Sequence, residues 1–187
     1  MRRITMGPRT FLFPMPTVLI GAMVEGRPNF MTVAYAGVVN AEPPTVAVGL
    51  RPVRHTRKGV QESGVFSLCI PPAGLVAETD FAGIYTGAKT DKAELFQVFY
   101  GALEKAPLIE GCPINLECRL VETVELGTHG VFMGEVVESH VQEDCLTDGL
   151  PDMGKVDPIL YATADRSYWR VGKRLAQAFS VGKKLKN

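Results

Sequence analysis

The sequence NFMTVAYAGVVNAEPPTVAVGLRPVRHTRK, residues 29–58, holds most of the unusual chemistry of this chain. It contains two apolar runs, residues 29–39 and 45–50, which Pro43 and Pro44 separate. The second run is short enough to be a strand buried on both faces. It leads into a cluster of cations over residues 51–58, beside a possible helix start. The stretch therefore predicts two strands that end at an anion-binding pocket on the edge of a sheet.

Strand-like runs recur on both sides of this stretch and come in pairs. Residues 17–24 are joined to residues 29–35 by the turn sequence Glu25-Gly26-Arg27-Pro28, which predicts a hairpin. Apolar and polar residues alternate over 114–120, and a turn at 126–130 leads into a second long strand over 131–141. Residues 65–70 and 159–161 add two further strands. These hairpins predict a mainly β fold that curves towards a closed barrel, since closure removes exposed strand edges.

Short helices are expected between the strands. Thr56 is a candidate N-cap and Gly64 a candidate terminator of a first helix. Residues 74–83 form a second candidate, and residues 93–99 form a third that Thr90 or Asp91 could cap. The acidic, Gly- and Pro-marked segment 143–158 indicates a loop, and the basic end from residue 168 onward is typical of a solvated tail.

The composition fits one domain over residues 1–187. Twenty Lys and Arg residues balance twenty Asp and Glu residues, so we expect no nucleic-acid partner. Pro14 and Pro16 interrupt the apolar run 11–24, which is too short to span a bilayer and is interpreted as a first strand, so no membrane association is expected. The four cysteines lack metal-site spacing, which favours buried free thiols in a reducing cytoplasm.

Two groups of donors could bind a phosphate. In residues 54–58, cations lie within one turn of the expected helix start, where backbone N–H groups and the helix dipole would also favour an anion. Thr86 and Gly87, with Lys89 and Lys92, form the second group, in which glycine permits close backbone approach. The spacing equally fits a solvated loop whose cations serve solubility. If the two groups converge, they could hold one phosphomonoester from two sides.

Other polar residues suggest a ligand more weakly. Residues 29–34 place one amide and one hydroxyl in an apolar strand, which suits the edge of a planar heterocycle, although Asn29 could simply lie in a turn. His129 could contact a ligand or donate a proton, although a loop histidine more often has no such role. No Ser-His-Asp arrangement, carboxylate pair or metal triad stands out, so an enzyme built on this chain would depend on a cofactor.

Several segments share an order and spacing that identify a family. They are residues 29–34, the step from Pro43-Pro44 into 46–50, Arg54-His55-Thr56, Thr86-Gly87 with Asp91-Lys92, 115–118, 127–129 with 134–136, and 168–172. Together they resemble the flavin reductase-like, FMN-binding split-barrel family, and within it the flavoredoxin group. The resemblance spans residues 14–183. It implies a six-stranded antiparallel Greek-key barrel with flanking helices, a homodimer, and one FMN per subunit near the dimer interface.

The resemblance also implies which residues bind the cofactor. Arg54, Thr56 and Lys58 would contact the FMN phosphate, with help from Thr86, Gly87 and Lys92. The segment Asn29, Phe30, Met31, Thr32, Val33 and Ala34, together with Val48 and Gly49, would line the isoalloxazine ring. His129 matches a position near the nicotinamide site of some reductases. The loop 85–92 departs from the pattern, because relatives often carry Ser-Gly-Arg there.

Two functions follow as hypotheses. In the first, the protein is an FMN-binding oxidoreductase in which NADH or NADPH gives hydride to flavin N5 and the flavin passes the electrons onward. In the alternative, it is a flavin-carrying electron-transfer protein that a redox partner protein reduces and that has no nicotinamide site. A barrel that binds another phosphorylated ligand without redox chemistry is a third possibility. Apolar content beyond the needs of a small barrel, with the Tyr168-Trp169 pair, predicts a second copy as partner.

Overall fold

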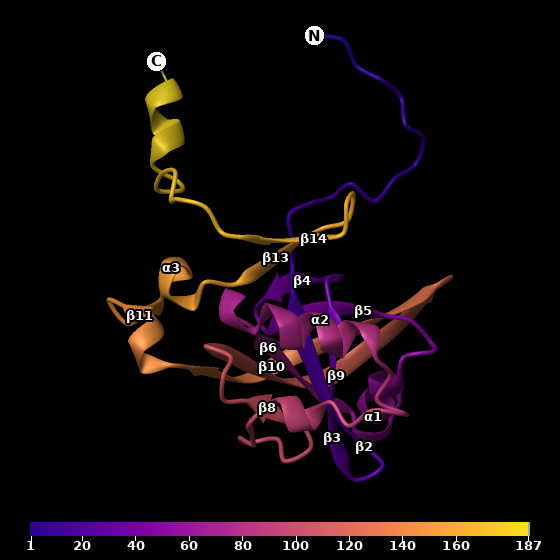
Figure 1. The fold of residues 1–187 in the computed structure, drawn as a ribbon. Coiled ribbons are helices and arrows are strands. Elements are labelled where there is room, and N and C mark those ends of the chain that lie inside the picture. The colour runs from indigo at the N-terminus through magenta and orange to yellow at the C-terminus, as the bar shows by residue number, and fades with distance from the viewer. Residues whose placement is uncertain (187) are drawn as a thin grey trace.

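The computed structural model describes residues 1–186 and confirms a mainly β fold with short flanking helices (Figure 1). The main sheet is antiparallel and has seven strands, one more than expected, because residues 36–41 form an additional edge strand. In spatial order the strands are β3 (Arg27–Val33), β2 (Val18–Val24), β6 (Val65–Ile70), β9 (Ile114–Leu126), β10 (His129–Val141), β5 (Pro44–Leu50) and β4 (Ala36–Ala41). The sheet is open, and β3 and β4 form its two edges.

Smaller elements surround this sheet. The short strands are β1 (Met15–Pro16), β13 (Ile159–Ala162) and β14 (Ser167–Arg170) in one sheet, β7 (Val98–Phe99) with β8 (Leu108–Ile109), and β11 (Leu146–Thr147) with β12 (Leu150–Pro151). The helices are α1 (His55–Ser63), α2 (Val76–Ile84) and α3 (Met153–Val156), with 3₁₀ turns η1 (Ala73–Leu75), η2 (Ala93–Leu95), η3 (Glu143–Cys145) and η4 (Val181–Leu185). Within residues 1–186 no helix has the length and apolar character needed to cross a membrane.

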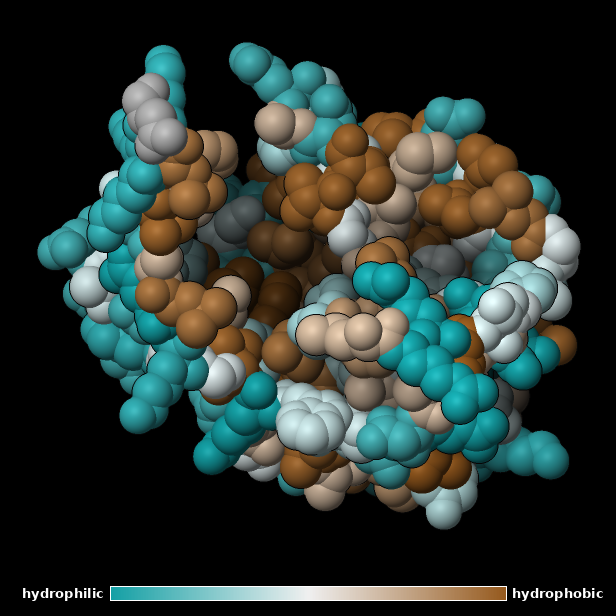
Figure 2. All heavy atoms as spheres, turned by 90° about the horizontal axis from the view of Figure 1, so that it is seen from above, coloured by the Kyte–Doolittle hydropathy of each residue, from teal (hydrophilic) through white to brown (hydrophobic). Residues whose placement is uncertain are grey.

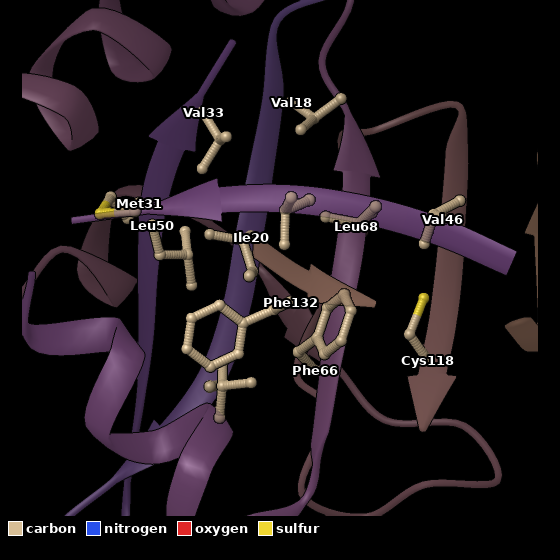
Figure 3. Close-up of a cluster of buried hydrophobic side chains, with 13 residues drawn as sticks. Val18, Ile20, Met31, Val33, Val46, Leu50, Phe66, Leu68, Cys118 and Phe132 are labelled. Atoms are coloured by element: carbon tan, nitrogen blue, oxygen red, sulfur yellow. The ribbon is translucent and has the colours of Figure 1, made fainter. Parts of the chain in front are cut away.

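The concave side of the sheet encloses the main hydrophobic core. Figure 3 shows Phe66 of β6, Phe132 of β10 and Ile20 of β2 among its side chains. Each strand contributes alternate residues, because successive side chains of a strand point to opposite faces. Gly134 leaves room for this packing, since a Cβ at that position would overlap the Phe66 ring. Hydrophobic burial across β2, β6 and β10 thus curls the sheet around its core.

A second cluster lies on the other face of β2 and β3. Leu19 and Phe30 pack there against Ala82 of α2 and Ile109 of β8, and the Phe30 ring meets Phe96 edge-on with centroids 5.5 Å apart. This cluster fixes α2 beside β3, which positions the last turn of that helix for the site described below. The expected free thiols are confirmed and are all buried, namely Cys69, Cys112, Cys118 and Cys145.

The hairpins and the strands at 65–70 and 159–161 are confirmed, and two local predictions need correction. Thr56 does not cap α1, which begins at His55, because its hydroxyl accepts a hydrogen bond from Asn29 instead. Gly64 does end α1, in the left-handed conformation. The helix expected over residues 93–99 is one 3₁₀ turn followed by β7, since Phe96 and Val98 pack into the second cluster.

The C-terminal part is more ordered than its composition indicates. The segment 143–158, expected as a loop, contains η3, the β11–β12 hairpin and α3, which Asp152 caps through its side chain. Residues 167–170 are not a solvated tail, because they form β14 against β13. Tyr168 on this strand donates a hydrogen bond to Asp80 of α2 across 2.9 Å, which joins the C-terminal hairpin to the helix.

Glu117 is a fully buried carboxylate on β9. It accepts hydrogen bonds from the backbone N–H groups of Ala102 and Leu103 and from His140 Nε2, the last at 2.7 Å. Burial alone would raise the pKa of Glu117, but these three hydrogen bonds outweigh burial and lower it. The carboxylate thereby fastens the connection between β7 and β8 to the main sheet.

We expect Glu117→Gln to lower the free energy of unfolding by about 2–3 kcal/mol at pH 7, because one amide cannot accept from all three donors. The Glu117 carboxylate contributes fully to the free energy of unfolding above its ordinary pKa of 4.5. This contribution is lost as the pH falls through the lower pKa that Glu117 has in the folded protein. Urea denaturation at several pH values measures both effects. Glu104→Gln, an exposed change in the same connection, should stay within about 0.5 kcal/mol of wild type. Equal losses for both variants would contradict this account.

Candidate functional site

The edge strand β3 borders the main cleft of the molecule. Backbone groups of β3 that point away from β2 have no partner strand in the main sheet. Two adjoining hollows, of about 680 and 450 Å³, lie along this edge and share five lining residues. These residues are Thr32, Ala34, Arg54, Tyr161 and Arg166. We call the two hollows together the β3 cleft. Its other wall is the C-terminal hairpin of β13 and β14.

Two cations converge at the last turn of α2 beside this cleft. Arg54 Nη1 donates to the Gly83 carbonyl at 3.2 Å, and Lys92 Nζ donates to the Ala82 carbonyl at 3.0 Å. The C-terminal carbonyls of a helix attract cations through their partial negative charge. Within residues 1–186, neither side chain forms an ion pair with a carboxylate. The site therefore holds an excess of positive charge.

The ammonium group of Lys92 is held in a buried position, which is unfavourable for a charged group. Its residue is only 2% exposed, and burial, followed by repulsion from Arg54, lowers the pKa of its ammonium group to about 8. A buried charge without a counterion is unfavourable, so an anion bound here would restore the balance. The cleft itself is lined by Arg51, Arg54 and Arg166, against one carboxylate, Asp80 of α2. The donor set fits a phosphate-bearing ligand.

Asn29 and Thr56 form a buried polar pair, which we call the polar wall, between the β3 cleft and a second hollow. Asn29 Nδ2 donates to Thr56 Oγ1 at 2.6 Å, and both residues are buried. Gly87 lies against them so closely that a Cβ there would overlap the Asn29 amide and approach His55. Beyond the wall is a groove of about 620 Å³ between the β2–β3 turn, α1 and residues 87–92, with Arg27, Lys58, Lys89, Glu25 and Asp91 among its lining residues. Glycine at position 87 is thus required by close packing.

His129 stands at the start of β10, at the end of the cleft near Gly49. Its ring lies 5.2 Å from that of Tyr35, and its Nδ1 is 2.9 Å from Thr128 Oγ1. Burial, with the charges of Arg51 and Arg54, lowers the pKa of His129. The imidazole is therefore neutral at pH 7, able to accept a hydrogen bond at one nitrogen and donate one at the other.

The structure divides the predicted site residues between two hollows. The β3 cleft is lined by Met31, Thr32, Val33, Ala34, Gly49, Arg54 and His129. The groove is lined by Asn29, Lys58, Gly87 and Lys92, although the ammonium of Lys92 reaches α2. Thr86 is exposed beside the groove, whereas Phe30, Val48 and Thr56 have buried side chains in the core or the polar wall. For Phe30 and Thr56, only the backbone could contact a ligand.

Sequence reasoning missed the wall that the C-terminal hairpin supplies. Tyr161, Arg166 and Tyr168 line the cleft from residues more than one hundred positions away from β3. Arg166 occupies the turn between β13 and β14 with a positive φ of 58°. No spacing rule links this turn to β3, because only the folded sheet brings them together. The sequence offered one signal, the segment 168–172, which carries part of the family resemblance.

The fold is that of a split-barrel protein, with a cleft lined by cations along an open sheet edge. A family model described as "Flavin reductase like domain" matches residues 9–169, and the chain belongs to this family. The whole main sheet, both helices at the cleft and the β13–β14 hairpin up to Trp169 lie within the match.

Three relatives describe the similarity more closely. A crystal structure of flavoredoxin from Methanosarcina acetivorans is 42% identical and has a TM-score of 0.96, with 99% of this chain and 100% of that chain covered. Flavoredoxin of Desulfovibrio vulgaris (Miyazaki F) is 38% identical with a TM-score of 0.91, covering 97% and 100%. FMN reductase (NADH) RutF of Ancylobacter novellus is 32% identical over 114 residues, 60% of each chain.

The uncompensated charge at Lys92 makes a prediction about stability. We expect Lys92→Met to raise the free energy of unfolding of flavin-free protein by about 1–2 kcal/mol at pH 7, because the buried charge costs more than its bond to Ala82 gives back. Below pH 8 the Lys92 ammonium is charged in the folded protein, and the full cost of burying this charge lowers the stability of wild type. This cost shrinks as the pH rises from 8 towards 10.5, so the difference in free energy of unfolding between Lys92→Met and wild type should become smaller over that range. Thermal unfolding from pH 7 to 10 measures it. The exposed change Lys89→Met should show no such pH dependence, and a destabilised Lys92→Met at pH 7 would refute the charge account.

Proposed function

We propose that this protein binds FMN in the β3 cleft and acts as an oxidoreductase. The observation that carries the proposal is the pair of cations at the end of α2, where Arg54 and Lys92 lack a carboxylate partner within residues 1–186. A phosphomonoester supplies two negative charges and several acceptor oxygens, which suits this pair. Membership of the flavin reductase-like family and the FMN reductase name of one relative support FMN as the ligand.

The same cleft offers complementary groups for the flavin ring. The N–H and C=O groups of residues 31–33 that point away from β2 can pair with the donors and acceptors along the pyrimidine edge of an isoalloxazine ring. Met31, Val33 and Gly49 line this part with apolar surface. The buried pair of Asn29 and Thr56, with Gly87 against it, holds residues 54–58 and 86–92 in position for the phosphate and the ribityl chain. Lys58 and Thr86 lie at the outer side of this wall.

Bound FMN would supply the redox chemistry, accepting hydride from NADH or NADPH and passing electrons to an acceptor. The residues of this chain would bind, orient and shield the reactants. Neutral His129, beside Tyr35 at the end of the cleft, is placed to accept or donate a hydrogen bond to a nicotinamide carboxamide. The name of the RutF relative favours NADH as donor.

The second candidate function is electron transfer without a nicotinamide donor. It is favoured by the two flavoredoxin structures, which match nearly the whole chain. In that case a reduced partner protein would deliver electrons, and His129 would contact the ring or the partner. For either function we place the protein in the cytoplasm, where its four buried thiols would stay reduced. We also propose that two copies form a homodimer with the flavin site near their interface.

The phosphate contact predicts a selective loss of affinity. Arg54→Ala should raise the dissociation constant of FMN about tenfold to a hundredfold, because a charge-assisted contact is removed. Riboflavin, which lacks the phosphate, should bind almost as before. Fluorescence titration of flavin-free protein with both ligands measures the difference, and Arg119→Ala, an exposed change on β9, serves as control. Equal weakening of both ligands would mean that Arg54 acts on the ring or on folding.

Anaerobic reduction separates the two candidate functions. If the protein is a reductase, NADH or NADPH should bleach the flavin absorbance of the FMN-loaded protein without air. His129→Asn should then slow the rate constant of bleaching by about tenfold or more while leaving FMN affinity unchanged. Because burial, with the charges of Arg51 and Arg54, lowers the pKa of His129 below its ordinary value of 6.5, the wild-type rate should stay level as the pH falls from 8 to 7. Bleaching by a reduced partner protein, but by neither nucleotide, would establish the electron-transfer function instead.

A further inference from the structure

A further hollow opens beside the end of the β3 cleft, over strand β5. Its volume is about 410 Å³, which is within the range of roughly 300–1,000 Å³ that is typical of small-molecule sites. Tyr35, Gly49 and His129 line both this hollow and the β3 cleft, so the two spaces adjoin. We call this space the β5 hollow. A molecule bound in it would lie next to a ligand in the cleft.

The β5 hollow exists because neighbouring strands lack bulky side chains on one face. Gly37 of β4 pairs with Ala47 of β5, on the face opposite the main core, since the residues on either side of Ala47 are buried in that core. Gly49 lies two residues further along β5, on the same face. The floor of the hollow is therefore backbone and one methyl group, while the larger side chains of Leu126 and Val131 stand at its rim.

The chemistry of the β5 hollow differs from that of the β3 cleft. Three arginines line the cleft, whereas no charged residue of the described range 1–186 lines the hollow. Its lining side chains are apolar apart from the Tyr35 hydroxyl and the His129 imidazole. Because an unpaired charge is costly in apolar surroundings, an occupant of this hollow should carry no phosphate or carboxylate.

Hydrophobic side chains are exposed elsewhere on the surface as well. Figure 2 views the molecule from the side on which both termini lie and shows such side chains gathered around a hollowed part of the surface. Exposed apolar residues alone do not identify an occupant, since they are normal on protein surfaces. The β5 hollow is distinguished by its contact with a ligand cleft and by two polar groups that one small molecule could meet.

The backbone fixes the position of Tyr35. Its carbonyl accepts a hydrogen bond from the Gly49 N–H at 2.7 Å. Its side chain lies over Gly49, where an added Cβ would come within 3.1 Å of Tyr35 Cβ. The glycine thus lets the phenol ring rest against β5, with the His129 ring 5.2 Å away.

The neighbour of His129 determines which hydrogen bond the imidazole can offer. Thr128 Oγ1 is 2.9 Å from His129 Nδ1, so the hydroxyl can donate to this nitrogen. The proton of the neutral ring is then on Nε2, which becomes a donor. The lowered pKa of His129 keeps the ring neutral at pH 7. His129 and Tyr35 can therefore offer an N–H and an O–H to the same uncharged molecule.

We propose that the β5 hollow binds a small, uncharged, conjugated carbonyl compound, of which a cyclic enone is the simplest form, as a hydride acceptor. The inference rests on the proposed FMN site and names the class of compound that the reduced flavin would reduce. The carbonyl oxygen would accept a hydrogen bond from His129 Nε2, and the apolar ring would lie on the floor at Ala47. Conjugation is needed because it makes the β-carbon of the C=C bond electron-poor.

The reaction is a two-electron reduction of the C=C bond. A hydride from reduced FMN in the β3 cleft adds to the β-carbon, while His129 Nε2–H stabilises the negative charge that develops on the carbonyl oxygen. The Tyr35 hydroxyl gives a proton to the α-carbon and regains one from water. The product is the saturated ketone, and FMN is left oxidised. Because hydride donor and acceptor must reach the same flavin, they would bind in turn.

The first test measures binding without turnover. Oxidised FMN-loaded protein with 15N-labelled histidine is titrated with cyclohexanone, which has the carbonyl but no C=C bond. The chain has three histidines, so His55 and His140 serve as internal controls in the NMR spectrum, and only the His129 signals should shift. Ala47→Leu, which fills the floor, should raise the dissociation constant of cyclohexanone at least tenfold. The exposed change Ala41→Leu on β4 should stay within twofold of wild type.

The second test measures hydride transfer. FMN-loaded protein is reduced by light with EDTA in the absence of air, so no nicotinamide is needed, and cyclohex-2-enone is added. The flavin absorbance should recover at least tenfold faster than that of free reduced FMN, with one cyclohexanone formed per flavin. Tyr35→Phe should slow this recovery at least tenfold while binding cyclohexanone within twofold of wild type. Ala47→Leu should slow recovery by the enone but not recovery by ferricyanide.

The outcomes separate this inference from the proposed function. Failure of the protein to bind FMN would overturn both. Bound FMN that is reduced by NADH, NADPH or a partner protein, with no shift of His129 and no recovery by the enone, would overturn the inference alone. Recovery that Ala47→Leu leaves unchanged would place the reaction outside the β5 hollow. A wild-type rate for Tyr35→Phe would exclude Tyr35 as the proton donor, and an unchanged FMN dissociation constant confirms that each variant is folded.

Discussion

An antiparallel sheet that curls around its core without closing must leave two edges, and this constraint shapes the rest of the molecule. Burial of side chains such as Phe66 and Phe132 curls the sheet, but β3 and β4 remain unpaired to each other. The unpaired backbone groups on an edge strand are free to bond to water, to a ligand or to another chain. At β3 they border the cleft in which we propose that FMN binds, and the other edge, β4, is almost wholly exposed. The open fold thus provides the cleft beside β3.

Electrostatic interactions determine where the cations lie beside the β3 edge. The second cluster holds α2 beside β3, so the negative end of its dipole draws Arg54 and Lys92 to one point. Lys92 is kept there at a cost to the flavin-free protein, since its pKa falls to about 8. Such a cost is common where a site is prepared for a ligand of opposite charge. The chain separates charge on a larger scale as well, because residues 1–13 and 171–186 together hold eight Lys and Arg residues and no Asp or Glu.

Local patterns gave reliable information where a single physical rule decides the outcome. Alternation over residues 114–120 predicted β9, and the turn at 126–130 predicted its pairing with β10, because strand periodicity and turn chemistry act over a few residues. Gly64 marked the end of α1, since it adopts a left-handed conformation that other residues avoid. Thr56 was misread as a cap because its partner, Asn29, lies 27 residues away.

By itself, the sequence determined the mainly β class, the hairpins, the two groups of phosphate-binding candidates and the family. These features depend on the conformational preferences of neighbouring residues and on motifs that can be recognised in the sequence without knowing which residues are in contact. Only the tertiary structure decided that Arg54 and Lys92 meet at α2, that Phe30 turns into the core, and that Tyr161 and Arg166 close the cleft. These facts depend on the packing of segments separated by tens to more than a hundred residues. No local rule specifies such packing, because its free energy belongs to the assembled core.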